Sequence, residues 1–313
     1  MIEFQGVSKA YHGVAAIQDL NLHIGQGELV VLIGPSGSGK STALKMINRM
    51  VTHDAGRIVF DGQEIDRFDV LALRRRMGYA IQSVGLFAHW TVERNIATVP
   101  HLLGWSRARI TQRVTELLTL FELEPALFRH RYPHQLSGGQ QQRVGVARAL
   151  AADPAVLLMD EPFGALDPVT RAALQLELKR VHQASGKTIV LVTHDIDEAL
   201  LLASQIVLLN QGRVEQVGTP LALLEHPASN FVLDFFGRAD LGIKLLSLKP
   251  VAPLVRSTPA PADAPRLAAT ATLREAVASL AAHGVTQLAV VDAQNQWLGS
   301  LHASDIFAPQ AHG

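Results

Sequence analysis

Nine consecutive residues in the first part of the chain combine the groups that bind a phosphate chain. They read Gly34-Pro35-Ser36-Gly37-Ser38-Gly39-Lys40-Ser41-Thr42 and match the pattern G-x-x-x-x-G-K-S/T. The glycines allow backbone N–H groups to face an anion, Lys40 carries a positive charge for the β- and γ-phosphates, and Ser41 offers a hydroxyl to Mg²⁺. The stretch therefore predicts binding of ATP or GTP together with Mg²⁺.

Polar residues follow three apolar segments that are typical of buried parallel strands. These residues are two carboxylic acids, a histidine and an amide: Asp160 and Glu161 after residues 156–159, His194 after residues 188–192, and Gln82 at the end of residues 77–82. Adjacent carboxylates are costly at such a place unless they meet a cation or take part in chemistry. Because ligands bind at the carboxyl ends of parallel strands, we expect these residues and the phosphate loop to meet in one crevice.

A second glycine-containing segment, Leu136-Ser137-Gly138-Gly139-Gln140, begins another predicted helix. Ser137 is a favourable N-cap and the paired glycines permit close approach of another molecule, but alone the segment indicates an anion site with only moderate specificity. Asp167 follows the two carboxylates, and Tyr11 lies between two segments of alternating polarity. From local sequence Tyr11 is equally consistent with a core filler and with a ring that stacks on a base.

The elements that must position these residues are predicted from hydrophobic patterning. Residues 29–33 form a fully apolar strand before the phosphate loop, and a helix follows the loop. Residues 2–25 alternate, which is typical of an antiparallel edge with one solvated face. Apolar residues have helical spacing from 92 to about 127, and another helix covers 141–150. The fold class is therefore α/β, with a parallel core sheet, an antiparallel β edge and a helical subdomain at about 83–150.

Composition limits the possible partners. The chain has 313 residues, 48% of them hydrophobic, and its 28 basic residues balance its 28 acidic residues. This balance gives no support to nucleic acid as a partner, and the absence of cysteine excludes disulfides and thiolate metal sites. The longest membrane candidate, residues 199–209, is too short and is interrupted by Ser204 and Gln205. Any membrane role is therefore expected to be peripheral.

In this order, the motifs together resemble those of the ATP-binding cassette (ABC) family over residues 1 to about 237. The resemblance implies a phosphate-loop NTPase that binds ATP and Mg²⁺, and it favours stacking of Tyr11 on adenine. It also implies a role for each motif: Gly34 to Thr42 as the phosphate loop, Ser137 to Gln140 as the family signature, Asp167 at a dimer seam, Ser41, Gln82 and Asp160 around Mg²⁺, Glu161 as general base, and Gln82 and His194 as contacts of the γ-phosphate.

The resemblance also implies a head-to-tail homodimer in which the signature of one cassette closes over the ATP held by the other. A lone chain would then bind ATP but hydrolyse it poorly. This agrees with the chemistry of the signature, since Ser137 and the N–H groups of Gly138 and Gly139 are anion donors without a phosphate of their own.

Three further stretches, residues 73–83, 95–100 and 227–237, resemble ABC importers of glycine betaine, choline and related osmoprotectants. This finer resemblance implies a peripheral location on the cytoplasmic face of the inner membrane and a separate solute-binding protein. Integral-membrane permease subunits would dock near the apolar loop from Val84 to Trp90. Two alternatives stay open, namely an ABC importer of a different small solute and a soluble ABC ATPase without a transport role.

The C-terminal part is expected to hold a linker and a small module. Residues 238–271 are an extension and a linker with five of the chain's 15 prolines. Residues 272–313 resemble a single regulatory module of the cystathionine-β-synthase (CBS) type. Asp305 matches the ribose-binding acid of such modules, but His302 stands where serine or threonine is expected. Nucleotide or ionic-strength sensing and simple dimerisation therefore remain alternatives.

Overall fold

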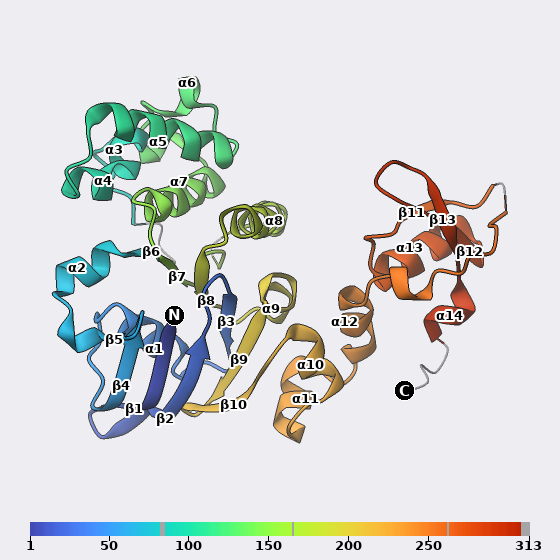
Figure 1. Ribbon diagram of the computed structural model, residues 1–313, viewed down its shortest axis with the longest axis horizontal. Helices are drawn as coiled ribbons and strands as arrows, with labels where there is room; N and C mark the ends of the chain where they lie inside the picture. The colour runs from blue at the N-terminus through green and yellow to red at the C-terminus, as the bar shows by residue number, and fades with distance from the viewer. Residues whose placement is uncertain (82–84, 165, 262, 308–313) are drawn as a thin grey trace. The chain divides into compact units, whose positions relative to one another are not determined.

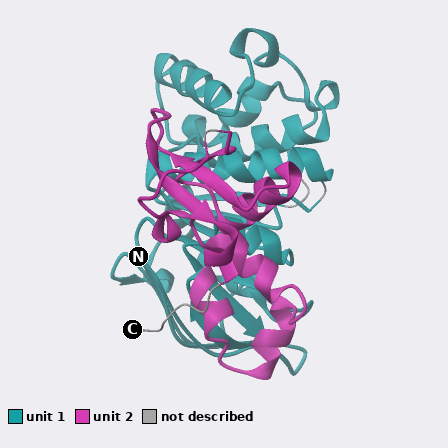
Figure 2. Cartoon of the chain, turned by 90° about the vertical axis from the view of Figure 1, so that its right-hand side faces the viewer, with its two compact units in different colours: residues 1–219 teal, residues 220–313 magenta. Residues whose placement is uncertain are grey.

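The computed structural model describes residues 1–81, 85–164, 166–261 and 263–307, and the chain divides into two compact units, Met1–Thr219 and Pro220–Gly313 (Figure 2). Gln82, Ser83 and Val84 lie outside the described residues. No helix in the described ranges is both long and apolar enough to span a membrane.

An antiparallel sheet of four strands, in the order β2-β1-β4-β5, begins the first unit. Its strands are β1 (Ile2–Tyr11), β2 (Val14–Ile24), β4 (Ala55–Phe60) and β5 (Gln63–Glu64). β1 pairs with both β2 and β4, with Ile2 opposite Ile24 and Phe60. This confirms the antiparallel edge, although Tyr11 is the last residue of β1 and not part of a loop.

The second sheet positions the motifs. It has six strands in the order β10-β9-β3-β8-β7-β6. They are β3 (Leu29–Ile33), β6 (Met77–Ile81), β7 (Val156–Asp160), β8 (Thr188–Val192), β9 (Gln205–Asn210) and β10 (Arg213–Gly218), of which only β10 runs antiparallel to its neighbour. Every residue of β3 and β8 is buried, as their apolar sequences predict.

The register of this sheet brings the carboxyl ends of four strands into one row. Leu32 of β3 pairs with Val192 of β8, Val192 pairs with Asp160 of β7, and Asp160 pairs with Ile81 of β6. The phosphate loop, His194 and the two carboxylates therefore leave the sheet side by side, although as many as 160 positions separate Leu32 from Val192 in the chain.

Helices complete the first unit. α1 (Lys40–Ile47) follows the phosphate loop, and its apolar face joins one core with residues of both sheets, among them Phe60 and Leu158. Between β6 and β7 the chain forms a helical group, which Figure 1 shows in green: α3 (Val92–Ile96), α4 (Thr98–Leu102), α5 (Arg107–Leu120), α6 (Pro125–Phe128) and α7 (Gly138–Leu150). The remaining α-helices of this unit are α2 (Val70–Arg75), α8 (Pro168–Ser185) and α9 (Ile196–Leu202).

The second unit begins with α10 (Pro220–Glu225), α11 (Asn230–Phe236) and α12 (Leu241–Leu248). A sheet in the order β11-β12-β13 follows, formed by β11 (Arg266–Ala268), β12 (Gln287–Val291) and β13 (Trp297–His302) and accompanied by α13 (Leu273–His283) and α14 (Ala303–Phe307). Residues 238–271 are more structured than an extended linker. They contain α12 and β11, and the side chain of Val251 is fully buried in the core of this unit. The boundary at Gly237 and the CBS-type module stay predictions.

Asp305, the acid matched to the ribose contact, forms an ion pair with Arg256 in the same unit. Its side chain is largely buried, and its Oδ2 has no hydrogen-bond partner among the described residues. The described structure therefore gives Asp305 a structural partner, and nucleotide sensing by this unit stays a prediction.

Candidate functional site

A cavity of about 450 Å³ lies at the carboxyl ends of β3, β7 and β8. Most of the residues that line it belong to the predicted motifs: Tyr11, Ala16, Ser36, Gly37, Gly39, Lys40, Ser41, Thr42, Glu161 and His194. The structure thus brings together residues from four separate parts of the chain. Ala16 was not predicted, since an alanine in an alternating strand carries no chemical signal.

The phosphate loop requires glycine at positions where the backbone is both left-handed and crowded. Gly39 has a φ of 99°, and a Cβ there would lie 2.4 Å from the carbonyl oxygen of Ala16 in β2. Gly34 has a φ of 151°, and a Cβ would lie 2.0 Å from the carbonyl oxygen of Leu209. Larger residues at either position would therefore push the loop away from the strands that support it.

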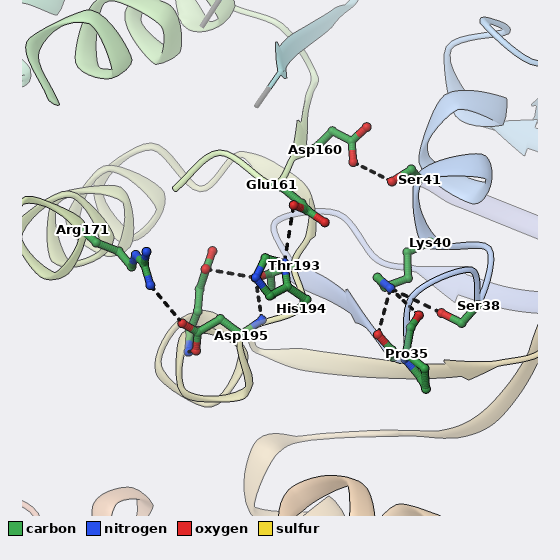
Figure 3. A network of polar contacts seen from close by, with 12 residues as sticks. Pro35, Ser38, Lys40, Ser41, Asp160, Glu161, Arg171, Thr193, His194 and Asp195 are labelled. Atoms are coloured by element: carbon green, nitrogen blue, oxygen red, sulfur yellow. Dashed lines mark hydrogen bonds and ion pairs between the residues drawn. The ribbon is translucent and has the colours of Figure 1, made fainter. Parts of the chain in front are cut away.

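Lys40 begins α1, and its ammonium group is held at the loop (Figure 3). Lys40 Nζ donates to the carbonyl oxygens of Gly34 and Pro35, each at 2.8 Å. Burial lowers the pKa of Lys40, and the carboxylates of Glu161 and Asp160 oppose that shift. A polyanion in the cavity would stabilise the charged form of Lys40 in the same way, because an opposite charge favours ionisation.

Ser41 and Asp160 supply two oxygen atoms at one edge of the cavity. Ser41 Oγ donates to Asp160 Oδ1 at 2.8 Å, and Lys45 Nζ lies 3.5 Å from Asp160 Oδ2. Hydroxyl and carboxylate oxygens are suitable ligands for Mg²⁺, which commonly takes its other ligands from phosphate and water. The described residues contain no cluster of three or more His, Asp and Glu side chains that could hold a metal alone. The residues present therefore fit a magnesium ion that arrives with a phosphate ligand.

Glu161 and His194 face one another across the cavity, and Figure 3 shows their side chains in contact. His194 Nδ1 lies 3.4 Å from Glu161 Oε2. Glu161 adopts a φ of 47°, which is unusual for a residue with a side chain, and its N–H donates to the Val192 carbonyl at 2.9 Å. Residues other than glycine that adopt a left-handed backbone conformation tend to occur at functional sites, where the surrounding structure compensates for the strain.

Two of the predicted motifs, the segment from Ser137 to Gln140 and Asp167, are not among the described residues that line this cavity. Ser137 and Gln140 form a capping box at the start of α7, with Ser137 Oγ accepting from the Gln140 N–H at 3.3 Å. A Cβ on Gly139 would lie 2.4 Å from the Thr170 side chain, so a larger residue there would have to displace that side chain of α8. Asp167 caps α8, and the hydrogen bond from Thr170 lowers its pKa.

The loop that carries His194 contains a polar network that sequence reasoning missed. Thr193 Oγ1 donates to Glu198 Oε2 at 3.0 Å and accepts from the Asp195 N–H at 3.0 Å. Asp195 Oδ1 in turn accepts from the Glu198 N–H at 3.0 Å and caps α9. The only available signal was the run of Thr, Asp and Glu around a predicted helix start, which is common in structural caps.

Glu198 gives a pH prediction. Burial raises its pKa to about 8 against a usual value of 4.5, although the hydrogen bond from Thr193 opposes the shift. Between these values the folded protein holds more protons than the unfolded chain, so stability falls as pH rises. Relative to Glu198→Gln, the free energy of unfolding of the wild type should fall by at most about 1.4 kcal/mol per pH unit between roughly pH 5 and pH 8.

This difference can be measured by urea unfolding at pH 5, 6, 7 and 8. A Trp297→Phe background leaves Trp90 and Trp105, so that fluorescence reports on the first unit alone. Glu116→Gln removes an exposed carboxylate and is the matched control. Stability curves of wild type and Glu198→Gln that stay parallel over this range would show that Glu198 is not a buried neutral acid.

Residues 17–164 match the family model described as "ABC transporter". The chain is 61% identical over 306 residues, which are 98% of it and 99% of the relative, to the glycine betaine uptake system ATP-binding protein YehX of Escherichia coli (strain K12). It is 46% identical to the glycine betaine/carnitine/choline transport ATP-binding protein OpuCA of Bacillus subtilis (strain 168), covering 94% of the chain and 76% of the relative.

A solved structure shares the fold. The dimeric, post-hydrolysis structure of the ATP-binding cassette MJ0796 bound to ADP and Pi has a TM-score of 0.62 and 35% identity. The match covers 70% of this chain and 99% of that one. It confirms the predicted fold class of a cassette with a parallel core sheet, an antiparallel sheet and a helical subdomain.

Proposed function

This chain belongs to the ABC transporter family and is the ATP-hydrolysing subunit of an import system, and we propose that its solute is an osmoprotectant of the glycine betaine and choline type. The observation that carries the proposal is the 61% identity, over nearly the full length of both chains, to the ATP-binding protein of a glycine betaine uptake system. The cavity adds the chemistry that such a subunit needs, since it joins a phosphate loop to a paired carboxylate and histidine.

The geometry supports a division of labour during hydrolysis. Lys40 and the N–H groups of the phosphate loop hold the phosphates, while Ser41 and Asp160 would hold Mg²⁺, which neutralises phosphate charge when bound. Glu161 orients the attacking water and accepts its proton as oxygen bonds to the γ-phosphorus and the bridge to the β-phosphate breaks. His194, 3.4 Å from Glu161, contacts the γ-phosphate and fixes the Glu161 side chain. The contact of Gln82 with Mg²⁺ and the γ-phosphate stays a prediction, because Gln82 lies outside the described residues.

The placement of the signature supports a homodimer. Ser137 and Gly138 are exposed at the start of α7, so their N–H and hydroxyl groups can reach a phosphate held by another copy. Asp167 is likewise exposed at the start of α8. A second copy would therefore complete each ATP site, with Ser137 to Gln140 over the phosphates and Asp167 at the seam.

Tyr11 is proposed to stack on adenine. It lines the cavity and keeps 44% of its surface exposed, which leaves a ring face for a base. Tyr11→Ala should raise the KM for ATP about 5- to 100-fold, the range for loss of one base–aromatic stack, with a smaller change in kcat. Tyr11→Phe keeps the ring and should behave as wild type in the same steady-state ATPase assay. Equal KM values for the alanine and phenylalanine variants would exclude stacking.

Permease subunits are proposed to dock on the loop that ends at Trp90. Of the predicted stretch, Val84 lies outside the described residues, but Phe87 is 41% exposed and its ring centroid lies 4.4 Å from that of Trp90. The buried Asn95 fixes the loop by bonding the backbone of Phe87 and Trp90. An open groove of about 890 Å³ that Trp90 and Trp105 help to line continues this surface. Docking here would hold the chain peripherally on the cytoplasmic face of the inner membrane.

The function is tested by transport and co-purification together. Membranes from cells that produce the chain with its import system should take up radiolabelled glycine betaine or choline in an ATP-dependent way, and Lys40→Met should abolish the uptake. Uptake of a different solute would support the first alternative. Recovery of the chain with ribosomes or DNA, and never with a polytopic membrane protein, would support a soluble ATPase and overturn the proposal.

A further inference from the structure

Arg171 connects two loops that carry residues of the hydrolytic site. It lies in the first turn of α8, four residues after Asp167. Arg171 Nη2 donates to the carbonyl oxygen of Leu166 at 3.0 Å, and Arg171 Nη1 lies 3.5 Å from Asp195 Oδ2. Leu166 precedes Asp167, and Asp195 follows His194, so one planar guanidinium joins the proposed seam loop to the loop that presents His194. Figure 3 shows the second of these contacts.

His194 depends on its neighbours for its position. Its side chain is 67% exposed and its ion-pair contact is with Glu161. The adjacent residues hold the loop, because the Thr193 N–H donates to the Leu32 carbonyl at 3.2 Å and Asp195 caps α9. A catalytic side chain is held precisely only when a surrounding shell fixes its backbone and rotamer.

The two oxygens of Asp195 have separate partners. Oδ1 accepts from the Glu198 N–H, and Oδ2 faces Arg171. The ion pair is about one-third exposed on each side, so its contribution to stability is small. A guanidinium fork is nevertheless suited to hold two acceptors at a fixed separation, which a flexible ammonium group does less well.

We propose that Arg171 is a positioning residue that links the seam loop at Leu166 and Asp167 to the His194 loop through Asp195. The proposal rests on the proposed function, since it requires hydrolysis at a site completed by a second copy. When a second copy closes on Asp167, any displacement of that loop reaches Asp195 through one side chain. Closure of the dimer would then adjust how His194 is placed against Glu161, which it already contacts at 3.4 Å in the single chain.

Three variants of the full-length chain test this link. Arg171→Met removes the hydrogen bond to Leu166 and the ion pair with Asp195 while keeping a long side chain. Asp195→Asn removes the charge that faces Arg171 but keeps an oxygen that can cap α9, since asparagine is a favourable N-cap. The double variant removes both partners. Arg180→Met, an exposed arginine on the same helix, is the matched control.

Each single variant should lower kcat about 10- to 100-fold, as expected for a misplaced catalytic group, with the KM for ATP within about twofold of wild type. The double variant should be no slower than the slower single one, because both remove the same link. Arg171→Lys should recover part of the loss. Arg180→Met should have a wild-type kcat.

Unchanged kcat in both single variants, fully additive losses, or a raised KM with unchanged kcat would overturn the proposal while leaving the proposed function intact. If Arg171→Met does not fold, Asp195→Asn decides the question alone, because it keeps the helix cap. A wild-type chain that shows no hydrolysis would overturn the proposed function, and the inference with it.

Discussion

Replacing Glu161 with glutamine is expected to leave ATP binding intact and to lower the hydrolysis rate about 10²- to 10⁴-fold, the range for loss of a positioned general base. Glutamine has the size of glutamate but cannot accept a proton from water. Phosphoryl transfer needs a group that orients the nucleophile, and the phosphate-binding residues alone do not supply one.

The structure explains why no neighbour is expected to replace Glu161. Asp160, the adjacent carboxylate, accepts a hydrogen bond from Ser41 at one oxygen and forms an ion pair with Lys45 at the other, so both of its oxygens already have partners. His194 faces Glu161 but does not carry the charge of a carboxylate base. The bound nucleotide should then persist, and the dimer that it closes should accumulate.

Two measurements check this prediction. Size-exclusion chromatography with ATP should move Glu161→Gln from monomer to dimer, whereas the wild type should return to monomer as ATP is consumed. Steady-state phosphate release should show the loss of rate, with the exposed Glu116→Gln as control. Undiminished hydrolysis by Glu161→Gln would remove Glu161 from the mechanism.

Substitution of Ser137 by arginine should have an effect of similar size through a different cause. Ser137 is the exposed N-cap of α7 and does not line the chain's own cavity. Arginine there would block a second copy from placing its phosphates on the Gly138 and Gly139 N–H groups. Loss of such preorganised donors costs about 10²- to 10³-fold in rate.

The affinity of the monomer for ATP should not change in Ser137→Arg, because Lys40 and the phosphate loop are untouched. This can be measured by equilibrium binding with a fluorescent ATP analogue. Ser106→Arg is the matched control, since Ser106 caps α5 through the same kind of bond to the N–H of Arg109 and is not part of a predicted motif. A wild-type rate for Ser137→Arg would contradict the proposed role of the signature.

Much of the cavity could be predicted because its chemistry is local in sequence. The phosphate loop needs glycine, lysine and serine at fixed spacing, and apolar segments before Asp160 and His194 identify buried strands. That these strand ends meet follows from a general rule for parallel sheets, and the pairing of Leu32, Val192 and Asp160 confirms it.

Other features could not be predicted because they depend on tertiary contacts. The ion pair of Arg171 and Asp195 joins positions 24 residues apart whose proximity depends on the packing of α8 and α9. The apolar composition of residues 199–209 does not show by itself that a helix and a strand share this run. Its interruption at Ser204 is the junction of α9 and β9, where the hydroxyl bonds both backbone groups of Leu29.

If two copies of this chain share each hydrolytic site, a mixture of two inactive variants should regain ATPase activity. Lys40→Met lacks the phosphate-binding lysine but keeps its signature, and Ser137→Arg has the opposite defect. In a mixed dimer, one site pairs an intact phosphate loop with an intact signature. An equal mixture should therefore recover roughly a quarter of the wild-type ATPase rate, since half of the dimers are mixed and each has one intact site of two. A mixture as inactive as either variant alone would contradict the shared site.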